Sequence, residues 1–208
     1  MLKKIELISG KKAYIESGLG DYCLRDTLEC GQCFRFERVT EGAVLPDEYL
    51  VTLKTGLVHV GQRETGELVF ISDGEGEYDP TADGDVREFF ALDTSLDEIK
   101  RDVIGHTDSE WLKEASQFGA GIAILKQDPW EMLISFIISQ NNNIPRIKKI
   151  IKQICAEYGV NLALQNRQNP SCPLSLCKGE PSEEICKRCG VCYSFPTPTD
   201  IVLRPEVI

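Results

Sequence analysis

The sequence predicts an α+β fold in which an antiparallel sheet comes first and helices follow. Up to residue 72, short runs of alternating or β-branched residues are separated by glycine-containing turns. After residue 85, apolar residues recur at helical spacing. Because the strands precede the helices instead of alternating with them, the order favours α+β over a parallel α/β sheet. We predict a sheet domain with flanking helices at 1–106, a helical segment at 107–160, and a linker, cysteine-rich insertion and truncated end at 161–208.

The predicted sheet is built from short, consecutive strands. Residues 3–16 predict one strand or a pair, and residues 22–28 predict a short helix. Phe34 and Phe36 alternate with charged residues, which predicts a strand with one buried face. Gly31 precedes that strand, where a backbone can turn sharply or be approached closely. Three more strands are predicted at 48–53, 57–62 and 68–72, joined by turns at 54–56 and 64–66.

Helices are predicted after the acidic loop 73–85. They span residues 86–92, 96–104 and 109–118, with capping residues at 93–95 and 107–108 between them. Residues 128–158 then organise the rest of the chain. Asp128, Pro129 and Glu131 predict a capped helix start, and the apolar run 132–138 predicts that this helix is buried on most sides.

This helix should end at residues 139–143, because the three asparagines there favour caps and turns. A second helix should begin near Pro145. Its predicted buried face consists of Ile147, Ile150, Ile151, Ile154, Cys155 and Tyr158. Its other sides carry Arg146, Lys148, Lys149 and Lys152. One interpretation is an ordinary helical hairpin with solvated lysines; the other is a tip that presents amides and an arginine to nucleic-acid bases.

The formal net charge of −10 is unevenly distributed. Residues 1–125 hold 13 Lys and Arg against 25 Asp and Glu, a charge of −12, and residues 126–208 hold 10 against 8, a charge of +2. A nucleic-acid-binding surface should therefore lie in the C-terminal part, and overall acidity argues against binding through charge alone. The sequence has no apolar run long enough for a signal peptide or a membrane span. We expect a monomeric cytoplasmic protein without membrane contact, associated with the nucleoid if bacterial.

Five cysteines lie within 21 positions near the end of the chain: Cys172, Cys177, Cys186, Cys189 and Cys192. Without an export signal, such a cluster indicates metal before disulfides. Four thiolates suit a closed structural zinc site, and the first four cysteines are the predicted ligands, with Cys192 as a possible substitute. Five uncoordinated cysteines and an iron–sulfur cluster remain the alternatives.

Three segments together resemble a known family. CGQCFRF at 30–36, QDPWEMLISFIISQNNNIPRI at 127–147 and YSFPTPTDI at 193–201 resemble 8-oxoguanine DNA glycosylases of the helix-hairpin-helix superfamily, in order and spacing. The resemblance implies a TATA-binding-protein-like antiparallel sheet domain followed by the start of a helical glycosylase domain. It also implies base-excision repair of damaged double-stranded DNA: the oxidised guanine is flipped out, and a lysine amine attacks C1′ before β-elimination. No catalytic cofactor is implied.

The resemblance assigns roles to three positions. Gly31 matches the glycine whose carbonyl accepts the N7 hydrogen of 8-oxoguanine, a hydrogen that guanine lacks. Asn141 matches the asparagine that fills the gap left by the extruded base. Arg146 matches an arginine that faces the orphaned cytosine, whose O2 and N3 accept hydrogen bonds. The simpler interpretations are that Gly31 only makes a turn, Asn141 only caps and Arg146 is only solvated.

The chain departs from the family at its catalytic end. The family's catalytic lysine lies in a glycine-rich hairpin after the third segment, and the aspartate follows it. We find no such hairpin before Ile208 and assign no catalytic residue in this chain. The leading hypothesis is the N-terminal portion of an 8-oxoguanine glycosylase with lyase activity. The alternatives are a non-catalytic zinc module that binds DNA or protein, and a glycosylase for alkylated bases. The Gly-Gln-x-Phe-Arg segment at 31–35 argues against the second alternative.

We expect this chain alone not to excise 8-oxoguanine, because no lysine in it matches the nucleophile. The measurement is strand cleavage of an 8-oxoguanine duplex after alkali, together with covalent trapping by borohydride. Robust enzyme-dependent cleavage, or a trapped protein–DNA adduct, would show that the chain holds a nucleophilic lysine after all.

Overall fold

The computed structural model describes residues 4–8, 11–54, 56–72, 79–162 and 192–202. It contains one six-stranded antiparallel sheet with the order β1-β2-β6-β5-β4-β3. The strands are β1 (Lys4–Ile8), β2 (Lys11–Glu16), β3 (Phe36–Arg38), β4 (Asp47–Thr52), β5 (Leu57–Gln62) and β6 (Leu68–Ser72). The sheet comes before most of the helices, so the α+β prediction is confirmed.

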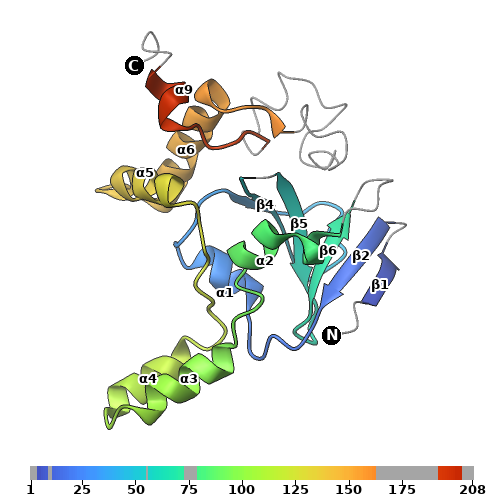
Figure 1. Ribbon diagram of the computed structural model, residues 1–208, viewed down its shortest axis with the longest axis vertical. Coiled ribbons are helices and arrows are strands. Elements are labelled where there is room, and N and C mark those ends of the chain that lie inside the picture. The colour runs from blue at the N-terminus through green and yellow to red at the C-terminus, as the bar shows by residue number, and fades with distance from the viewer. Residues whose placement is uncertain (1–3, 9–10, 55, 73–78, 163–191, 203–208) are drawn as a thin grey trace.

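The helices come almost entirely after the sheet (Figure 1). They are α1 (Leu24–Glu29), the 3-10 helix η1 (Pro80–Ala82), α2 (Gly84–Phe89), α3 (Leu96–Gly105), α4 (Glu110–Phe118), α5 (Pro129–Ser139), α6 (Ile144–Tyr158) and α9 (Pro198–Val202). Among the described residues, no helix is both long and apolar enough to cross a membrane.

The main core lies between one face of the sheet and the helices α1 and α2. Leu24 and Leu28 of α1 and Phe90, which follows α2, are fully buried against strand residues such as Tyr49 and Phe70. The Phe70 and Phe90 rings meet edge to face, with centroids 5.7 Å apart, a favoured geometry for aromatic pairs. The sheet face therefore explains why α1 and α2 are ordered although each has only six residues.

The segment 193–197 leads into the short helix α9, which begins at Pro198. The cause is a local capping box. The Thr197 backbone N–H donates to Asp200 Oδ2 over 2.8 Å, and the Asp200 N–H donates to Thr197 Oγ1 over 3.3 Å. Pro198 also suits the first turn of a helix, so this short segment carries a complete helix start.

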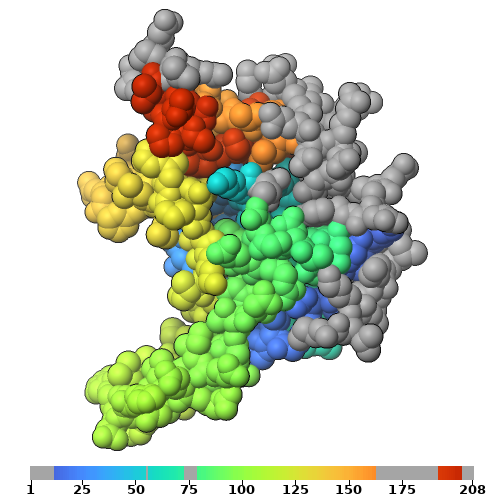
Figure 2. Space-filling view, viewed as in Figure 1, coloured from blue at the N-terminus to red at the C-terminus, as the bar shows by residue number. Residues whose placement is uncertain are grey.

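The hairpin of α3 and α4 projects away from the sheet (Figures 1 and 2). Both helices begin at serine caps, Ser95 and Ser109, and neither contains a buried residue. Trp111 is 83% exposed and Phe118 is 96% exposed. The predicted helices are therefore present, but their apolar faces are uncovered within the described residues.

The prediction that α5 is buried on most sides is wrong. Only Ser135 is buried in this helix. Four of its large apolar side chains are more than half exposed: Met132, Leu133, Phe136 and Ile137. An apolar run predicts burial only where another segment covers the helix, and the run itself does not identify that segment. Among the described residues α5 packs mainly against α6, which covers one side of it.

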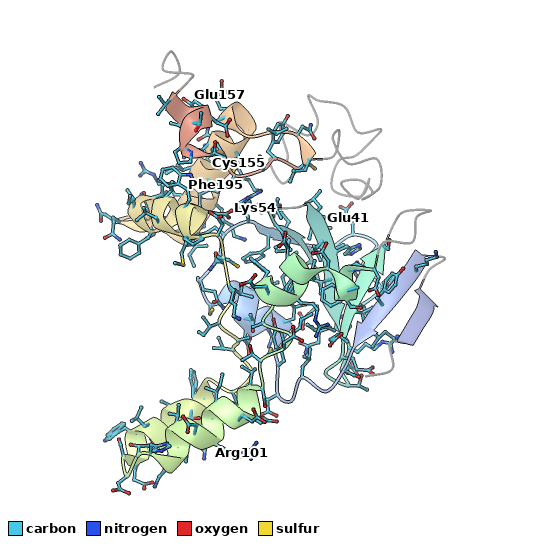
Figure 3. The ribbon with its side chains drawn as sticks, in the orientation of Figure 1. Glu41, Lys54, Arg101, Cys155, Glu157 and Phe195 are labelled. Atoms are coloured by element: carbon cyan, nitrogen blue, oxygen red, sulfur yellow. The ribbon has the colours of Figure 1, made fainter. Side chains whose placement is uncertain are left out.

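The predicted apolar face of α6 is largely confirmed. Ile147, Ile151 and Cys155 are at most 3% exposed and pack in a second cluster with Cys192 and Tyr193. Phe195 packs against the same cluster, and Figure 3 shows it beside Cys155 where α5, α6 and α9 meet. This second cluster joins the helical part to the sheet through Phe34 and Leu57.

Phe136→Ser and Ile151→Ala should differ sharply in cost, because one side chain is 65% exposed and the other is buried. Phe136→Ser should change the free energy of unfolding by no more than about 0.5 kcal/mol. Ile151→Ala should cost about 2–5 kcal/mol. Urea unfolding followed by circular dichroism measures both. Equal costs would mean that Phe136 is covered in solution.

Candidate functional site

Gly31 lies in the turn directly after α1. Its φ is +90°, a conformation that glycine adopts without the steric penalty of a side chain. A Cβ built at this position would meet no heavy atom of the described residues within 4 Å. The requirement for glycine is thus conformational, and the space beside the backbone is open. A group from outside the chain can therefore approach the Gly31 peptide closely.

Gln32 attaches this turn to the segment that leads into α5. Its side-chain N–H₂ donates to the carbonyls of Thr27 and Ala123, both over 2.8 Å. Its side-chain oxygen accepts from the Leu125 N–H over 2.9 Å. Its backbone carbonyl accepts from Gln127 Nε2 over 2.6 Å. The turn and the segment 123–127 are therefore held together although more than 90 residues separate them in sequence.

Arg35 joins the three segments on which the family resemblance rests. Its Nη1 donates to Glu131 Oε2 at the start of α5 over 2.8 Å, and its Nη2 donates to the Tyr193 carbonyl. The guanidinium also lies 6.0 Å from the centre of the Phe195 ring. Its side chain is only 7% exposed, and that of Glu131 is 18% exposed. Burial raises the pKa of the Glu131 carboxyl, and the Arg35 charge opposes that rise.

A second contact strengthens this junction. The Trp130 indole N–H at the start of α5 donates to the Pro196 carbonyl over 2.9 Å. The contacts of Glu131 and Trp130 therefore both come from the first turn of α5. In the same turn, Asp128 accepts from the N–H groups of Trp130 and Glu131. The start of α5 is fixed on the sheet and on the 193–196 segment, and the helix carries the asparagine corner at its other end.

The asparagine corner divides into structural and exposed residues. Asn142 Nδ2 donates to the Ile138 carbonyl over 2.7 Å, and Asn143 Oδ1 accepts from the Arg146 N–H over 3.0 Å. Asn141 differs: it is exposed and has a left-handed backbone with φ +57°. Its side chain makes no hydrogen bond to the described part of the chain. Two asparagines therefore shape the corner, and Asn141 projects from it.

The basic side of α6 is smaller than predicted. Lys148 is half-buried, with its Nζ 3.5 Å from the centre of the Phe36 ring and 3.2 Å from the Phe36 carbonyl. Burial lowers the pKa of this amine. Lys152 forms an ion pair with Glu37. These two lysines fasten α6 to β3, so Arg146 and Lys149 are the exposed cations of this helix.

The contacts of Gln32 and Arg35, together with helix α5, connect the predicted site residues. Gln32 and Arg35 tie the Gly31 turn to the segment before α5 and to its first turn, and Asn141 and Arg146 follow its end. Eleven residues of helix, about 16 Å, span the distance between the two ends of α5. Sequence reasoning missed Gln32, although it lies next to Gly31 in the same short motif.

The zinc prediction concerns residues that the structure does not describe. Cys172, Cys177, Cys186 and Cys189 all lie in the segment 163–191, outside the described residues. Cys192 is described and is fully buried in the second cluster. Within the described part of the chain, no group of three or more potential ligands could hold a metal ion. The zinc site stays a prediction.

Comparison with known proteins gives consistent matches. Residues 15–133 match the family "8-oxoguanine DNA glycosylase, N-terminal domain". An N-glycosylase/DNA lyase of Saccharomyces cerevisiae is 34% identical over 160 residues, which are 72% of this chain and 39% of that protein. An Arabidopsis thaliana N-glycosylase/DNA lyase is 30% identical over 131 residues, 60% of this chain and 32% of that protein. The chain therefore spans about a third of the length of these curated relatives.

A solved structure shows the same architecture. The 8-oxoguanine glycosylase/lyase of Clostridium acetobutylicum, in complex with double-stranded DNA containing cytosine opposite 8-oxoguanine, matches 99% of this chain and 67% of its own. The identity is 29% and the TM-score is 0.61. Fold and matches together define a member of the DNA glycosylase class. The chain belongs to the 8-oxoguanine DNA glycosylase family, and its residues 15–133 correspond to the N-terminal domain of that family.

Proposed function

We propose that this chain is the lesion-reading portion of an 8-oxoguanine DNA glycosylase/lyase and binds duplex DNA that contains oxidised guanine. The observation that carries the proposal is the Arg35 junction. Arg35 contacts Glu131, Tyr193 and Phe195, so three separate family segments form one structural unit. α5 starts at this unit, and the exposed Asn141 and Arg146 follow its other end, where a DNA duplex can reach them.

The chemistry of the exposed groups suits a flipped base. The Gly31 carbonyl is an acceptor for the N7 hydrogen of 8-oxoguanine, whereas guanine presents a lone pair there and would be repelled. Asn141 offers an amide that can fill the space in the base stack. Arg146 offers paired donors to the O2 and N3 of the opposing cytosine. These groups would act together once the base leaves the helix, as enzymes that modify bases require.

The charge distribution suits binding that depends on base chemistry more than on phosphates. Arg146 and Lys149 are the exposed cations of α6, and the whole chain carries −10. Few phosphate contacts predict a shallow dependence of affinity on salt. The Clostridium protein that matches this chain was solved with lesion-containing DNA, which supports DNA as the partner here.

The test is a binding comparison between two duplexes that differ only in the lesion. Fluorescence anisotropy with 8-oxoguanine opposite cytosine and with guanine opposite cytosine gives the ratio of affinities. We expect a preference of about tenfold or more for the lesion, equivalent to about 1.4 kcal/mol. Asn141→Ala should weaken binding to the lesion duplex, and Gln153→Ala, at an exposed position of α6, is the control. Equal affinities for the two duplexes would refute the proposal.

We further propose a structural zinc ion held by Cys172, Cys177, Cys186 and Cys189, with Cys192 as the substitute ligand. The donor set supports this, because four thiolates form a closed tetrahedral site. Metal analysis of freshly purified, reduced protein should find about one Zn²⁺ per chain. Cys186→Ser should lower that content, and Cys30→Ser, at an exposed cysteine outside the cluster, should not. Protein free of metal with reactive cysteines would exclude the site.

A further inference from the structure

We infer that Gln32 is the positioning residue for lesion discrimination, acting by fixing the direction of the Gly31 carbonyl. The inference rests on the proposed function and assigns Gln32 a role that it exerts through Gly31. Gln32 does not itself face the open space beside Gly31. Its side chain points into contacts with Thr27, Ala123 and Leu125.

Every polar group of the Gln32 side-chain amide has a hydrogen-bond partner. A glutamine amide offers two N–H donors and one carbonyl oxygen. Both donors are used, at 2.8 Å each, and the oxygen accepts at 2.9 Å. Two backbone carbonyls on one side and one backbone N–H on the other leave a single orientation for the amide. The residue is therefore held by backbone groups, which cannot move independently of the fold.

The Gly31 carbonyl depends on this arrangement because of peptide geometry. The Gly31 carbonyl and the Gln32 N–H belong to one rigid planar peptide unit. Gly31 itself has no side chain, and no described atom would contact a Cβ there. Glycine also moves easily between backbone conformations. The anchored Gln32, with its own carbonyl held by Gln127 over 2.6 Å, thus determines where the Gly31 carbonyl points.

Discrimination between 8-oxoguanine and guanine depends on the direction of the Gly31 carbonyl more than DNA binding itself does. Contacts to phosphates hold a protein on DNA without sensing the base, so binding to undamaged DNA does not need the Gly31 carbonyl. A hydrogen bond to N7–H weakens steeply when its geometry deteriorates, and so does the repulsion of a guanine lone pair. A carbonyl that can rotate would lose both effects. Loss of Gln32 contacts should therefore reduce the ratio of affinities and leave affinity for undamaged DNA nearly unchanged.

Gln32→Glu tests this with the full chain. The variant keeps an oxygen for the Leu125 N–H and places a second oxygen against the carbonyls of Thr27 and Ala123, where donors are needed. Gln117→Glu, on the exposed surface of α4, adds the same charge and is the matched control. Anisotropy with the 8-oxoguanine and guanine duplexes, each opposite cytosine, gives the affinity ratio. We expect Gln32→Glu to lower that ratio about tenfold, with affinity for the guanine duplex within about twofold of the control.

Lowering the pH should partly restore the ratio in Gln32→Glu, because protonation gives the introduced carboxyl one donor. Gln117→Glu should show no such recovery. If the wild type prefers the lesion and Gln32→Glu keeps the full ratio, the inference is wrong and the proposed function stands. If the wild type shows no preference, the proposed function fails and the inference fails with it. Should Gln32→Glu not fold, Gln127→Leu removes only the bond to the Gln32 carbonyl, and an unchanged ratio there overturns the inference.

Discussion

Arg35→Met should lower the free energy of unfolding by about 3–5 kcal/mol, the usual cost of removing one partner from a buried ion pair. The variant leaves the largely buried Glu131 carboxyl without its guanidinium and the Tyr193 carbonyl without a donor. Arg38→Met is the matched control. Arg38 pairs with Asp47 over 2.7 Å, but its side chain is 43% exposed, so its loss should cost less than about 1 kcal/mol. Urea unfolding of the two variants provides the comparison.

The Arg35→Met loss should also depend on pH in a defined direction. Burial raises the pKa of Glu131, and Arg35 is the group among the described residues that opposes that rise. The folded state then binds a proton more tightly than the unfolded state, so stability falls as pH rises through the window between the two pKa values. The deficit of Arg35→Met should therefore be smaller at pH 5 than at pH 8. Equal deficits for Arg35→Met and Arg38→Met, or a deficit that shrinks at high pH, would contradict a buried pair.

Arg146→Met should remove the preference for cytosine opposite the lesion. Paired donors from one guanidinium to cytosine O2 and N3 should contribute about 1–3 kcal/mol, by analogy with bidentate base readout. Thymine keeps the O2 acceptor but presents a hydrogen at N3. Adenine lacks this pair of adjacent acceptors. Methionine retains much of the side-chain length without the donors. The expected result is a loss of discrimination among the four opposing bases by about tenfold or more.

The measurement for Arg146→Met is the affinity for four lesion duplexes that differ only in the opposing base. Lys149→Met is the control, because Lys149 is an exposed cation of the same helix. It should weaken binding to all four duplexes about equally, as loss of a phosphate contact does. The same ranking and ratios in wild type and Arg146→Met would show that Arg146 is only a solvated helix residue.

Much of the fold was predictable because local patterns and tertiary contacts agree. The strands at 48–53, 57–62 and 68–72 lie within one residue of β4, β5 and β6, since glycine turns and β-branched runs specify them locally. The capped start of α5 at Asp128 is also local. The exposure of Phe136 was not predictable, because an apolar helix gives no information about which segment covers it.

In the candidate site, too, residues in short motifs were predictable and those defined by tertiary contacts were not. Gly31, Asn141 and Arg146 stand in short motifs, so a sequence can suggest them without a structure. Lys148 looked like part of a solvated face, and only the position of β3 shows that it lies on the Phe36 ring. Gln32 bonds to residues more than 90 positions away, and no spacing rule relates such partners.

The long sequence separation of these bonds also sets an order of events during synthesis. Thr27 Oγ1 donates to the Gly121 carbonyl, and the Gln32 amide bonds to residues 123 and 125, so the partners are 91 to 94 residues apart. A ribosome adding about 5–20 residues per second delivers the second partner roughly 5–20 seconds after the first. The Gly31 turn therefore has its local bond to the Thr27 carbonyl while residues 36–72 are made, but not its bonds to residues 121–125. The rates for the complete chain are a separate test: faster unfolding with an unchanged folding rate in Gln32→Glu would show that these contacts are absent from the folding transition state.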